Sequence, residues 1–432
     1  MSIGTRSVTL AVPMLLPLLA AAGFAHPNPQ PPPELPASLY RDRRERLMKE
    51  IGGCATAIAA QGEPTGVVQE YRQDHDFFWL TGINEPGAWL ILMPKAKYRR
   101  HVLFLRPRDP EAERWTGPRA PLSPSLKAQY AVDEVRRGNG GKWLLGSAPA
   151  HDCLAVVAPA EDLKDERTDV QALKQGAGAL GLKLVYKRDL LARMRSAHAP
   201  EEIALLERAV TITRAGHDAA ARATVPGVSE RDVQTQMEFA FFGAGATGLA
   251  YGTIVGSGEN GAVLHWGQNS RMLRSGDLVV IDAGAEYGRY ASDVTRTYPV
   301  SGKFTEEQAK VYRAVYQAQE DILAAIRPGA SMSDLQKAAE ESLRRSGYLD
   351  KFIHGFGHFV GLNVHDAGEY DLPIPAGAVF TVEPGVYLPE RGFGVRIEDE
   401  VLFLGDGKWR LLTADFPRKL EDVEAWVARA RR

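Results

Sequence analysis

Two apolar segments in the second half of the chain each end in a carboxylate, and this pattern constrains the fold more than any other. Leu-Val-Val-Ile directly precedes Asp282, and Phe-Thr-Val directly precedes Glu383. Short apolar runs bounded by turn residues are typical of buried strands. A second strand-like run follows each of them, the first carrying Asp293 and the other Glu398. The sequence therefore predicts two antiparallel hairpins that each hold a pair of acids in apolar surroundings.

The spacing in these hairpins predicts which acids face each other. With the first turn centred between Tyr287 and Gly288, Asp282 lies directly opposite Asp293, which places their Cβ atoms roughly 4.5–5.5 Å apart. With the second turn centred between Glu390 and Arg391, Glu383 lies opposite Glu398. Buried carboxylates this close repel each other and cannot both stay ionised without a cation. A single acid at a strand end is weak evidence, but four in matched pairs predict a metal site.

Histidines cluster in the same half of the chain. His354 and His358 stand four residues apart, but the two glycines between them disfavour the helix on which such a spacing binds zinc. We therefore expect a glycine-rich turn that presents one imidazole as a ligand, with another nearby. His265 and His365 each follow a strand-like run. Four carboxylates and one imidazole form a hard, oxygen-rich ligand set that favours Mn²⁺, and two such ions would lie about 3.5–4 Å apart.

The length of 432 residues predicts two domains. The first, an α/β domain, is expected over residues 38–195. The runs that indicate its elements are a helix at 41–51 and strands at 77–80, 88–92 and 101–105. The second domain is expected over residues 196–432, and it opens with a long helix, because Pro200 suits the first helical position and acids follow it.

The first 25 residues have the outline of a secretory signal peptide. Arg6 is their only charge, and the apolar run at 10–22 is shorter than the about 20 residues that span a bilayer. Small residues precede the expected cut after Ala25. We therefore expect a periplasmic or secreted protein without a membrane anchor in its mature form, and an exposed proline-rich linker at 26–37. The formal net charge of −2 gives no electrostatic reason to expect nucleic acid as a partner.

Cys54 and Cys153 are the only cysteines. Export would permit a bond between them, but isolated cysteines are more often buried as small apolar residues. We therefore favour two free thiols over a disulfide.

Residues 256–261 fit the G-x-G-x-x-G pattern of dinucleotide sites. That pattern requires a helix directly after the glycines. Residues 262–266 are strand-like instead, as are residues 251–255 before the glycines. We therefore interpret the glycines as the turn of a β-hairpin.

These segments together resemble the motifs of the Xaa-Pro aminopeptidase/prolidase family. The five motifs, in the family's order, are Ile281-Asp282-Ala283-Gly284, Ser292 to Thr297, His354 to His358, Val382-Glu383-Pro384-Gly385 and Arg396-Ile397-Glu398-Asp399. Further upstream, the segments similar to aminopeptidase P are Tyr71-Arg72-Gln73, Asn84-Glu85-Pro86 and Glu111 to Gly117. The resemblance implies an α+β chain with a C-terminal pita-bread domain, of the creatinase and methionine aminopeptidase type. A smaller α/β domain of the creatinase N-terminal type would precede it.

The resemblance also implies a metal-binding role for five residues. Asp282 would bind one of two metal ions, and Asp293 and Glu398 would bridge both. His358 and Glu383 would complete the second ion's ligands, and Glu383 would also transfer the proton.

Five other residues receive roles from the resemblance. His265 and His365 would hold the substrate carbonyl and the developing oxyanion, with His354 nearby. Arg396 would steady the carboxylates. Trp115 is similar to a tryptophan that, in aminopeptidase P, helps to wall a neighbouring subunit's pocket, and a homo-oligomer, dimer or tetramer, is implied.

The implied activity is release of the N-terminal residue from peptides with proline at the second position. A prolidase restricted to Xaa-Pro dipeptides is the main alternative, and it would need a cation for the free C-terminal carboxylate, which the sequence does not locate. The upstream domain favours aminopeptidase P. A pita-bread protein that only binds peptides or proteins should lack metal ligands. A creatinase-like hydrolase should not keep a complete set of them. All five ligands are present here, which disfavours both alternatives.

Overall fold

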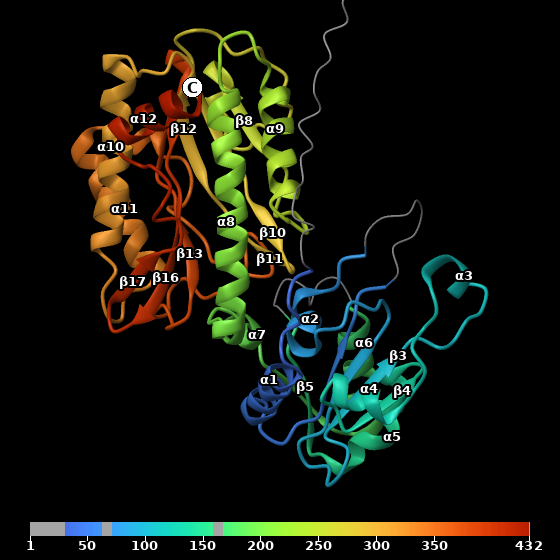
Figure 1. Cartoon of the computed structure of the whole chain (residues 1–432). Coiled ribbons are helices and arrows are strands. Elements are labelled where there is room, and N and C mark those ends of the chain that lie inside the picture. The colour runs from blue at the N-terminus through green and yellow to red at the C-terminus, as the bar shows by residue number, and fades with distance from the viewer. Residues whose placement is uncertain (1–30, 63–70, 159–166, 432) are drawn as a thin grey trace, which may run out of the picture.

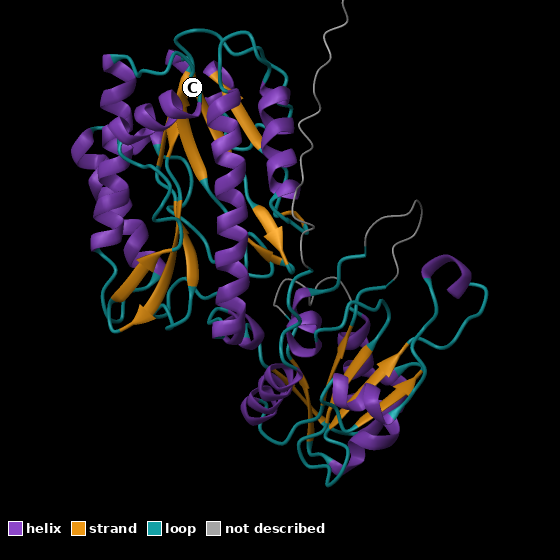
Figure 2. Ribbon diagram, in the orientation of Figure 1, coloured by secondary structure: helices purple, strands orange, loops and turns teal. Residues whose placement is uncertain are grey.

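The computed structural model describes residues 31–62, 71–158 and 167–431 (Figures 1 and 2). An N-terminal region, residues 31–195, lies beside a larger C-terminal region, residues 196–431 (Figure 1). The expected signal peptide lies outside the described residues, and so do residues 26–30 of the expected linker. The domain boundary predicted at 195/196 falls between two helices.

The described part of the expected linker, residues 31–36, contains no helix or strand. Most of it is exposed, but Pro32 and Leu35 are half-buried. Leu35 packs against the hydrophobic core, and a Cβ atom on Gly288 would lie 3.0 Å from the side chain of Pro32. The segment is therefore exposed as expected, but two of its residues hold it against the folded chain.

The N-terminal region is built on a four-stranded sheet in the order β1-β2-β3-β4, with a parallel pair β5-β6 beside it. Pairing is antiparallel between β1, β2 and β3, and parallel between β3 and β4. The strands are β1 (Thr56–Ala59), β2 (Trp89–Leu92), β3 (His101–Leu105), β4 (Glu134–Arg137), β5 (Cys153–Val156) and β6 (Lys183–Tyr186). The helices are α1 (Ala37–Glu50), α2 (His75–Thr81), α3 (Glu113–Thr116), α4 (Pro124–Gln129), α5 (Gly140–Ser147), α6 (Thr168–Leu180) and α7 (Leu190–Arg195).

The strand predicted at residues 77–80 is wrong, because this segment forms helix α2. Its Asp74 N-cap accepts a hydrogen bond from the backbone N–H of Phe77, and Gly82 ends the helix in the left-handed region at φ 70°. The apolar run satisfies either structure, and the caps on both sides select the helix.

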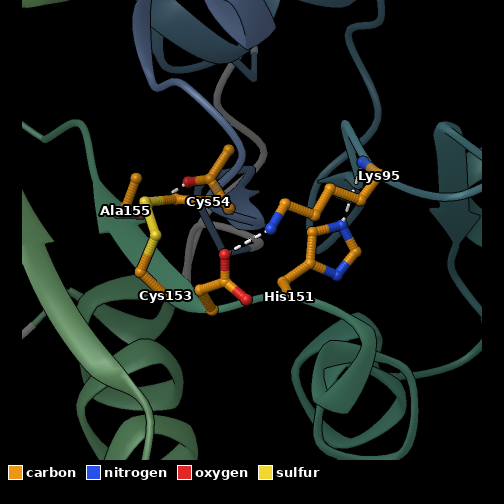
Figure 3. The surroundings of a disulfide bond; sticks show 7 residues. Cys54, Lys95, His151, Cys153 and Ala155 are labelled. Carbon is orange, nitrogen blue, oxygen red and sulfur yellow. Dashed lines mark hydrogen bonds and ion pairs between the residues drawn. A yellow bond between two sulfur atoms is a disulfide. The ribbon is translucent and has the colours of Figure 1, made fainter.

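The expectation of two free thiols is also wrong, because Cys54 and Cys153 form a disulfide. A parallel bridge pairs Ala55 with Leu154, and each cysteine directly precedes one member of that pair. Their Cα atoms consequently lie 4.6 Å apart. Figure 3 shows the bond, with the Lys95 backbone N–H against the ring of His151 beside it. The disulfide thus fastens the β5-β6 pair to the end of β1.

The C-terminal region places its strands between long helices, with α8 and α9 on one side and α10 and α11 on the other (Figures 1 and 2). The helices are α8 (Pro200–Ala223), α9 (Glu230–Gly243), α10 (Glu306–Ala324), α11 (Met332–Ser346) and α12 (Leu420–Ala430). The strand orders are β12-β9-β8, β11-β10-β7, β13-β16-β17 and β14-β15. The strands are β7 (Gly248–Leu249), β8 (Ile254–Ser257), β9 (Leu278–Asp282), β10 (Ala285–Tyr287), β11 (Tyr290–Ala291), β12 (Thr295–Pro299), β13 (Val379–Val382), β14 (Gly385–Leu388), β15 (Phe393–Arg396), β16 (Asp399–Gly405) and β17 (Lys408–Leu411).

Side-chain caps hold the first turns of α8 and α10. The carboxylate of Glu202 accepts a hydrogen bond from the backbone N–H of Ala199 at 2.8 Å, just before α8. Thr305 and Gln308 form a reciprocal capping box at the start of α10. Throughout the described ranges, no helix combines the length and hydropathy that a membrane crossing needs.

The register of the first acidic hairpin differs from the prediction. Tyr287 pairs with Tyr290, so the two-residue turn is Gly288-Arg289, with φ of 57° and 75°. Positive φ at both central residues suits the twist of a tight hairpin. The turn centre therefore lies one residue later than predicted, and Asp282 faces Thr295 instead of Asp293.

The register of the second acidic hairpin agrees with the prediction. Gly385 pairs with Arg396 and Val382 pairs with Asp399. The residues between these two pairs keep the same register, so Glu383 lies opposite Glu398.

The strand predicted at residues 262–266 is wrong. Strand β8 pairs with β9, and the glycines after it form a 3₁₀ turn rather than a hairpin loop. The buried carboxylate of Glu230 accepts hydrogen bonds from Asn260 at 3.0 Å and from the indole N–H of Trp266 at 2.9 Å. These bonds draw the segment towards α9, so it cannot extend along a sheet.

Candidate metal centre

A cavity of about 440 Å³ lies at the acidic ends of the two hairpins. Every predicted site residue except Trp115 lines it: His265, Asp282, Asp293, His354, His358, His365, Glu383, Arg396 and Glu398. Segments that lie more than a hundred residues apart in the chain therefore meet in one place. The two acid pairs meet in one cavity as expected. In the first pair, however, Asp282 and Asp293 do not lie directly opposite each other.

Trp115 lies elsewhere. It belongs to the short helix α3, at the tip of a loop that projects from the N-terminal region (Figure 1). Its side chain is 88% exposed. Within one chain, Trp115 is not part of the cavity.

The two aspartates come from neighbouring backbone positions. Asp282 is the last residue of β9, and Asp293 lies in the short gap between β11 and β12. The hydroxyl of Tyr251 lies between them, 2.5 Å from Oδ1 of Asp282 and in contact with Oδ1 of Asp293. Tyr251 was not predicted from the sequence, although it stands just before the strand that pairs with β9.

Glu383 lies in the gap between β13 and β14, and Glu398 lies in the gap between β15 and β16. The hydroxyl of Thr295 donates to Oε2 of Glu398 at 2.6 Å, and the hydroxyl of Thr381 lies 3.3 Å from Oε1 of Glu383. Nε2 of His358 is 3.4 Å from Oε1 of Glu383. Thr381 and the imidazole of His358 thus approach the same oxygen of Glu383.

One subset of these residues already has the spacing of a metal site. Donor atoms of Asp293, His358 and Glu398 all lie within 4.8 Å of one another. His358 Nε2 is 3.4 Å from Oδ2 of Asp293. Its Nδ1 lies 3.2 Å from the carbonyl oxygen of Phe359, and such a contact at one ring nitrogen leaves the other free to bind a metal.

The cavity holds more negative charge than it can keep ionised. Burial raises the pKa of Glu383 to about 7. Burial and repulsion from Asp293 raise the pKa of Glu398 well above its ordinary value, and burial and Asp282 raise that of Asp293. Although burial alone would lower it, contact with Asp293 and Glu383 raises the pKa of His358 to about 9. Divalent cations would supply the missing positive charge, so these residues fit a metal centre.

Arg396 brings a guanidinium into the lining of this cavity. Its guanidinium pairs with Oδ2 of Asp282 at 2.6 Å and donates to the hydroxyl of Tyr387 at 2.8 Å. That hydroxyl lies 2.8 Å from Nε2 of His354. Burial and the charge of Arg396 lower the pKa of His354 to about 4, so His354 is neutral at physiological pH.

Two further imidazoles face the cavity. The rings of His365 and His358 have centroids 4.1 Å apart, and burial and the charge of His358 lower the pKa of His365. His265 lines the same cavity. An imidazole N–H at this position can donate a hydrogen bond to a substrate carbonyl.

Glu400 also supports the candidate metal centre, and it was not predicted from the sequence. Its side chain is fully buried, and one carboxylate oxygen accepts a hydrogen bond from the backbone N–H of Asp293 at 2.6 Å. Burial raises its pKa to about 8. The available signal was the run of three acids from Glu398 to Glu400 in an otherwise apolar strand.

Comparison with known proteins agrees with this architecture. Residues 204–403 match the model of metallopeptidase family M24, and residues 40–140 match that of the aminopeptidase P N-terminal domain. The chain is 34% identical to the Xaa-Pro aminopeptidase of Escherichia coli (strain K12), over 92% of this chain and 99% of that protein. It is 31% identical to the Xaa-Pro aminopeptidase of Haemophilus influenzae, over 90% and 97% of the two chains. The solved structure of Pseudomonas aeruginosa aminopeptidase PepP superposes with a TM-score of 0.81 at 31% identity, covering 92% and 99%.

These matches confirm the predicted fold, a pita-bread domain preceded by a domain of the aminopeptidase P N-terminal type. They also agree with a cavity whose buried acids and imidazole suit divalent metal. The chain therefore belongs to the Xaa-Pro aminopeptidase (aminopeptidase P) family of M24 metallopeptidases, enzymes that hydrolyse peptide bonds.

Proposed function

We propose that the protein is a two-metal exopeptidase that releases the N-terminal residue from peptides with proline at the second position. The observation that carries this proposal is the convergence of four carboxylates and His358 in one cavity. The relatives' names support the substrate class, because both bacterial proteins are Xaa-Pro aminopeptidases.

The ligand assignment follows the predicted roles. Asp282 would bind one ion, and Asp293 and Glu398 would bridge the two. His358 and Glu383 would complete the second, which agrees with their mutual distance of 3.4 Å. Two divalent ions in such a site acidify water and stabilise negative charge on the attacked carbonyl. The hardness of the oxygen ligands favours Mn²⁺.

The chain's own residues would supply the proton and orient the substrate. The proline nitrogen carries no hydrogen in the substrate, so it needs a proton in order to leave as an amine. Glu383 can carry that proton, because its carboxylate lines the cavity beside His358, and a carboxylate within reach of the reacting atoms can accept and then donate a proton. His265 and His365 would bind the carbonyl oxygen, and Arg396 would hold Asp282 in place through their 2.6 Å contact.

A comparison of substrate length tests this proposal against a prolidase. Purified protein supplied with Mn²⁺ is offered Xaa-Pro dipeptides, Xaa-Pro-Xaa tripeptides and matched Xaa-Ala-Xaa tripeptides. We expect cleavage of the Xaa-Pro-Xaa tripeptides, little cleavage of the alanine controls, and release of the first residue only, detected by mass spectrometry. Exclusive cleavage of dipeptides would favour a prolidase, and no cleavage at all would favour a protein that only binds peptides.

We infer a further role for Trp115 in a homo-oligomer, a dimer or tetramer. Trp115 is 88% exposed on a projecting loop, so its indole can reach a second copy of the chain. The tryptophan that it resembles in aminopeptidase P also contributes to a neighbouring subunit's pocket. We expect Trp115→Ala to raise KM several-fold while the exposed control Tyr98→Ala leaves it unchanged. Light scattering gives the oligomeric state, and an active wild-type monomer would contradict this role.

We also infer export, with removal of residues 1–25. The Cys54–Cys153 disulfide supports an oxidising compartment. The mature chain would then begin His26-Pro27, which is itself a bond of the proposed substrate class. We expect active protein from the exported fraction to begin at Pro27, and the Glu383→Gln variant to begin at His26. Intact-mass measurement distinguishes these, and retention of residues 1–25 would contradict export.

A further inference from the structure

The loop that carries His365 is closed by the residue that follows it. The carboxylate of Asp366 turns back and accepts hydrogen bonds from the backbone N–H groups of Leu362 at 2.9 Å and Ala367 at 2.8 Å. Its side chain is 4% exposed. A Cβ atom on Gly361 would lie 2.1 Å from this carboxylate, so only glycine leaves room for it. The loop conformation therefore depends on one buried carboxylate.

Arg195 binds that carboxylate from the segment that joins the two regions. It is the last residue of α7, and one guanidinium nitrogen pairs with Oδ1 of Asp366. The other donates to Oδ1 of Asp76 in α2 at 2.6 Å. Although burial alone would lower it, the charges of Asp366 and Asp76 hold the pKa of Arg195 above its ordinary value. A permanently charged group thus connects the N-terminal region to the His365 loop.

Two more contacts hold the same loop from outside the cavity. Arg72 of the N-terminal region donates to the carbonyl oxygen of Leu362 at 2.9 Å, and its other nitrogen pairs with Glu286. Nε2 of His198 lies 2.9 Å from the carbonyl oxygen of Val360. The backbone on the N-terminal side of His365 is therefore fixed by groups that do not line the cavity.

The imidazole itself has less support than its loop. His365 is exposed to the cavity, with its ring centroid 4.1 Å from that of His358. The backbone of the loop therefore determines where the His365 imidazole lies relative to a substrate. A displacement of about 1 Å at a reacting group can cost on the order of 10²-fold in rate.

We propose that Arg195 is a positioning residue that, by bridging Asp76 and Asp366, fixes the loop from which His365 meets the substrate. This inference rests on the proposed function and deepens it, because it makes the N-terminal region part of the catalytic geometry. Arg195 touches neither the predicted metal ligands nor the cavity, so it acts through Asp366.

The test is a double-mutant cycle between Arg195→Met and His365→Ala, assayed with an Xaa-Pro-Xaa tripeptide and Mn²⁺. Met keeps most of the length of the side chain and removes its charge. We expect Arg195→Met to lower kcat/KM by about 10- to 100-fold, mainly through kcat, because the imidazole acts on the developing oxyanion. In the His365→Ala background, the same change should cost less than about threefold, because the group that it positions is gone.

A matched control separates this effect from a general loss of contact between the two regions. Arg43 pairs with Glu202 across the same boundary at 2.5 Å, with side chains 3% and 2% exposed, but it does not contact the His365 loop. We expect Arg43→Met to lower the melting temperature as Arg195→Met does, and to leave kcat within about threefold of the wild type. Metal content, measured on every variant, should remain unchanged.

Two milder variants keep the test decisive if Arg195→Met does not fold. Asp76→Asn preserves the volume of the side chain but removes the charge that pairs with Arg195. This change lies outside the His365 loop and should also reduce kcat. Arg195→Lys keeps the charge without the two-pronged geometry, and should restore part of the loss. Effects of Arg195→Met and His365→Ala that multiply independently would overturn the proposal, and so would unchanged kcat in Arg195→Met. Wild-type protein without peptidase activity would instead refute the proposed function.

Discussion

Replacing Glu383 by Gln is expected to lower kcat/KM for an Xaa-Pro-Xaa tripeptide by at least about 10³-fold. The amide keeps the size of the side chain but cannot carry the proton that the departing proline nitrogen needs. Because glutamine fills the same space, the far-ultraviolet circular dichroism spectrum should change little. Turnover and metal content are measured on the same samples.

The same substitution elsewhere in this hairpin provides the control. Glu390 lies in the turn of the second acidic hairpin, where its side chain is 52% exposed and 3.4 Å from Lys351. Glu390→Gln should leave kcat/KM within about twofold of the wild type, since it removes only a surface ion pair. Retained turnover in Glu383→Gln, with metals bound, would refute the proton-transfer role.

Removal of metal is expected to abolish activity, and added Mn²⁺ is expected to restore it. Chelator-treated, dialysed protein is assayed before and after addition of Mn²⁺, with Mg²⁺ and Zn²⁺ as comparisons. Full activity in the chelated protein would contradict the metal centre, and restoration by Zn²⁺ alone would contradict the preference for Mn²⁺.

Metal removal should also make stability depend on pH in a defined direction. In the metal-free site the pKa of Glu383 is raised by burial to about 7, from an ordinary value of 4.5. An acid whose pKa is higher in the folded state stabilises the fold while protonated, so this contribution is lost as pH rises from about 4.5 to 7. The pKa of His358 is raised from 6.5 to about 9, mainly by contact with Asp293 against the effect of its burial. Its contribution is complete below pH 6.5 and is lost as pH rises through 9.

Both trends have the same sign, so the metal-free protein should lose stability between pH 5 and 9. Bound cations replace the missing protons, so the melting temperature gained on adding Mn²⁺ should grow with pH, by at least about 3 °C between pH 5 and 8. Differential scanning calorimetry with and without chelator measures this difference. A gain that is constant or falls with pH would contradict the electrostatic account.

The sequence predicted the second acidic hairpin better than the first, and the turns explain why. The turn of the second hairpin is centred midway between Glu383 and Glu398, so pairing residues at equal distances from that centre gives the correct register. In the first hairpin the conformation of Gly288-Arg289 moves the centre by one residue. Asp293 nevertheless reaches the cavity, because it stands in the gap between β11 and β12 rather than in the ladder.

The residues that the sequence did not reveal depend on contacts between distant segments. Tyr251 acts through aspartates 31 and 42 residues away. The disulfide depends on a bridge between segments 99 residues apart. Helix α2 was missed because an apolar run fits a strand as well as a buried helix face, and only the Asp74 cap distinguishes them. Local patterns indicate the predicted metal ligands, whereas the groups that contact those residues appear only in three dimensions.

The tip of the first acidic hairpin has a consequence for dissecting the protein. Arg289, whose backbone has a φ of 75°, stacks its guanidinium over the ring of Phe78 at 4.3 Å and donates to Oδ1 of Asn84 at 2.6 Å. The hairpin that presents Asp282 at one end is thus anchored to the N-terminal region at the other. A truncated protein beginning at residue 196 would lack Phe78 and Asn84, and with them these two contacts of Arg289. Screening, crystallisation and directed evolution of the enzyme should therefore use the two regions together as one unit.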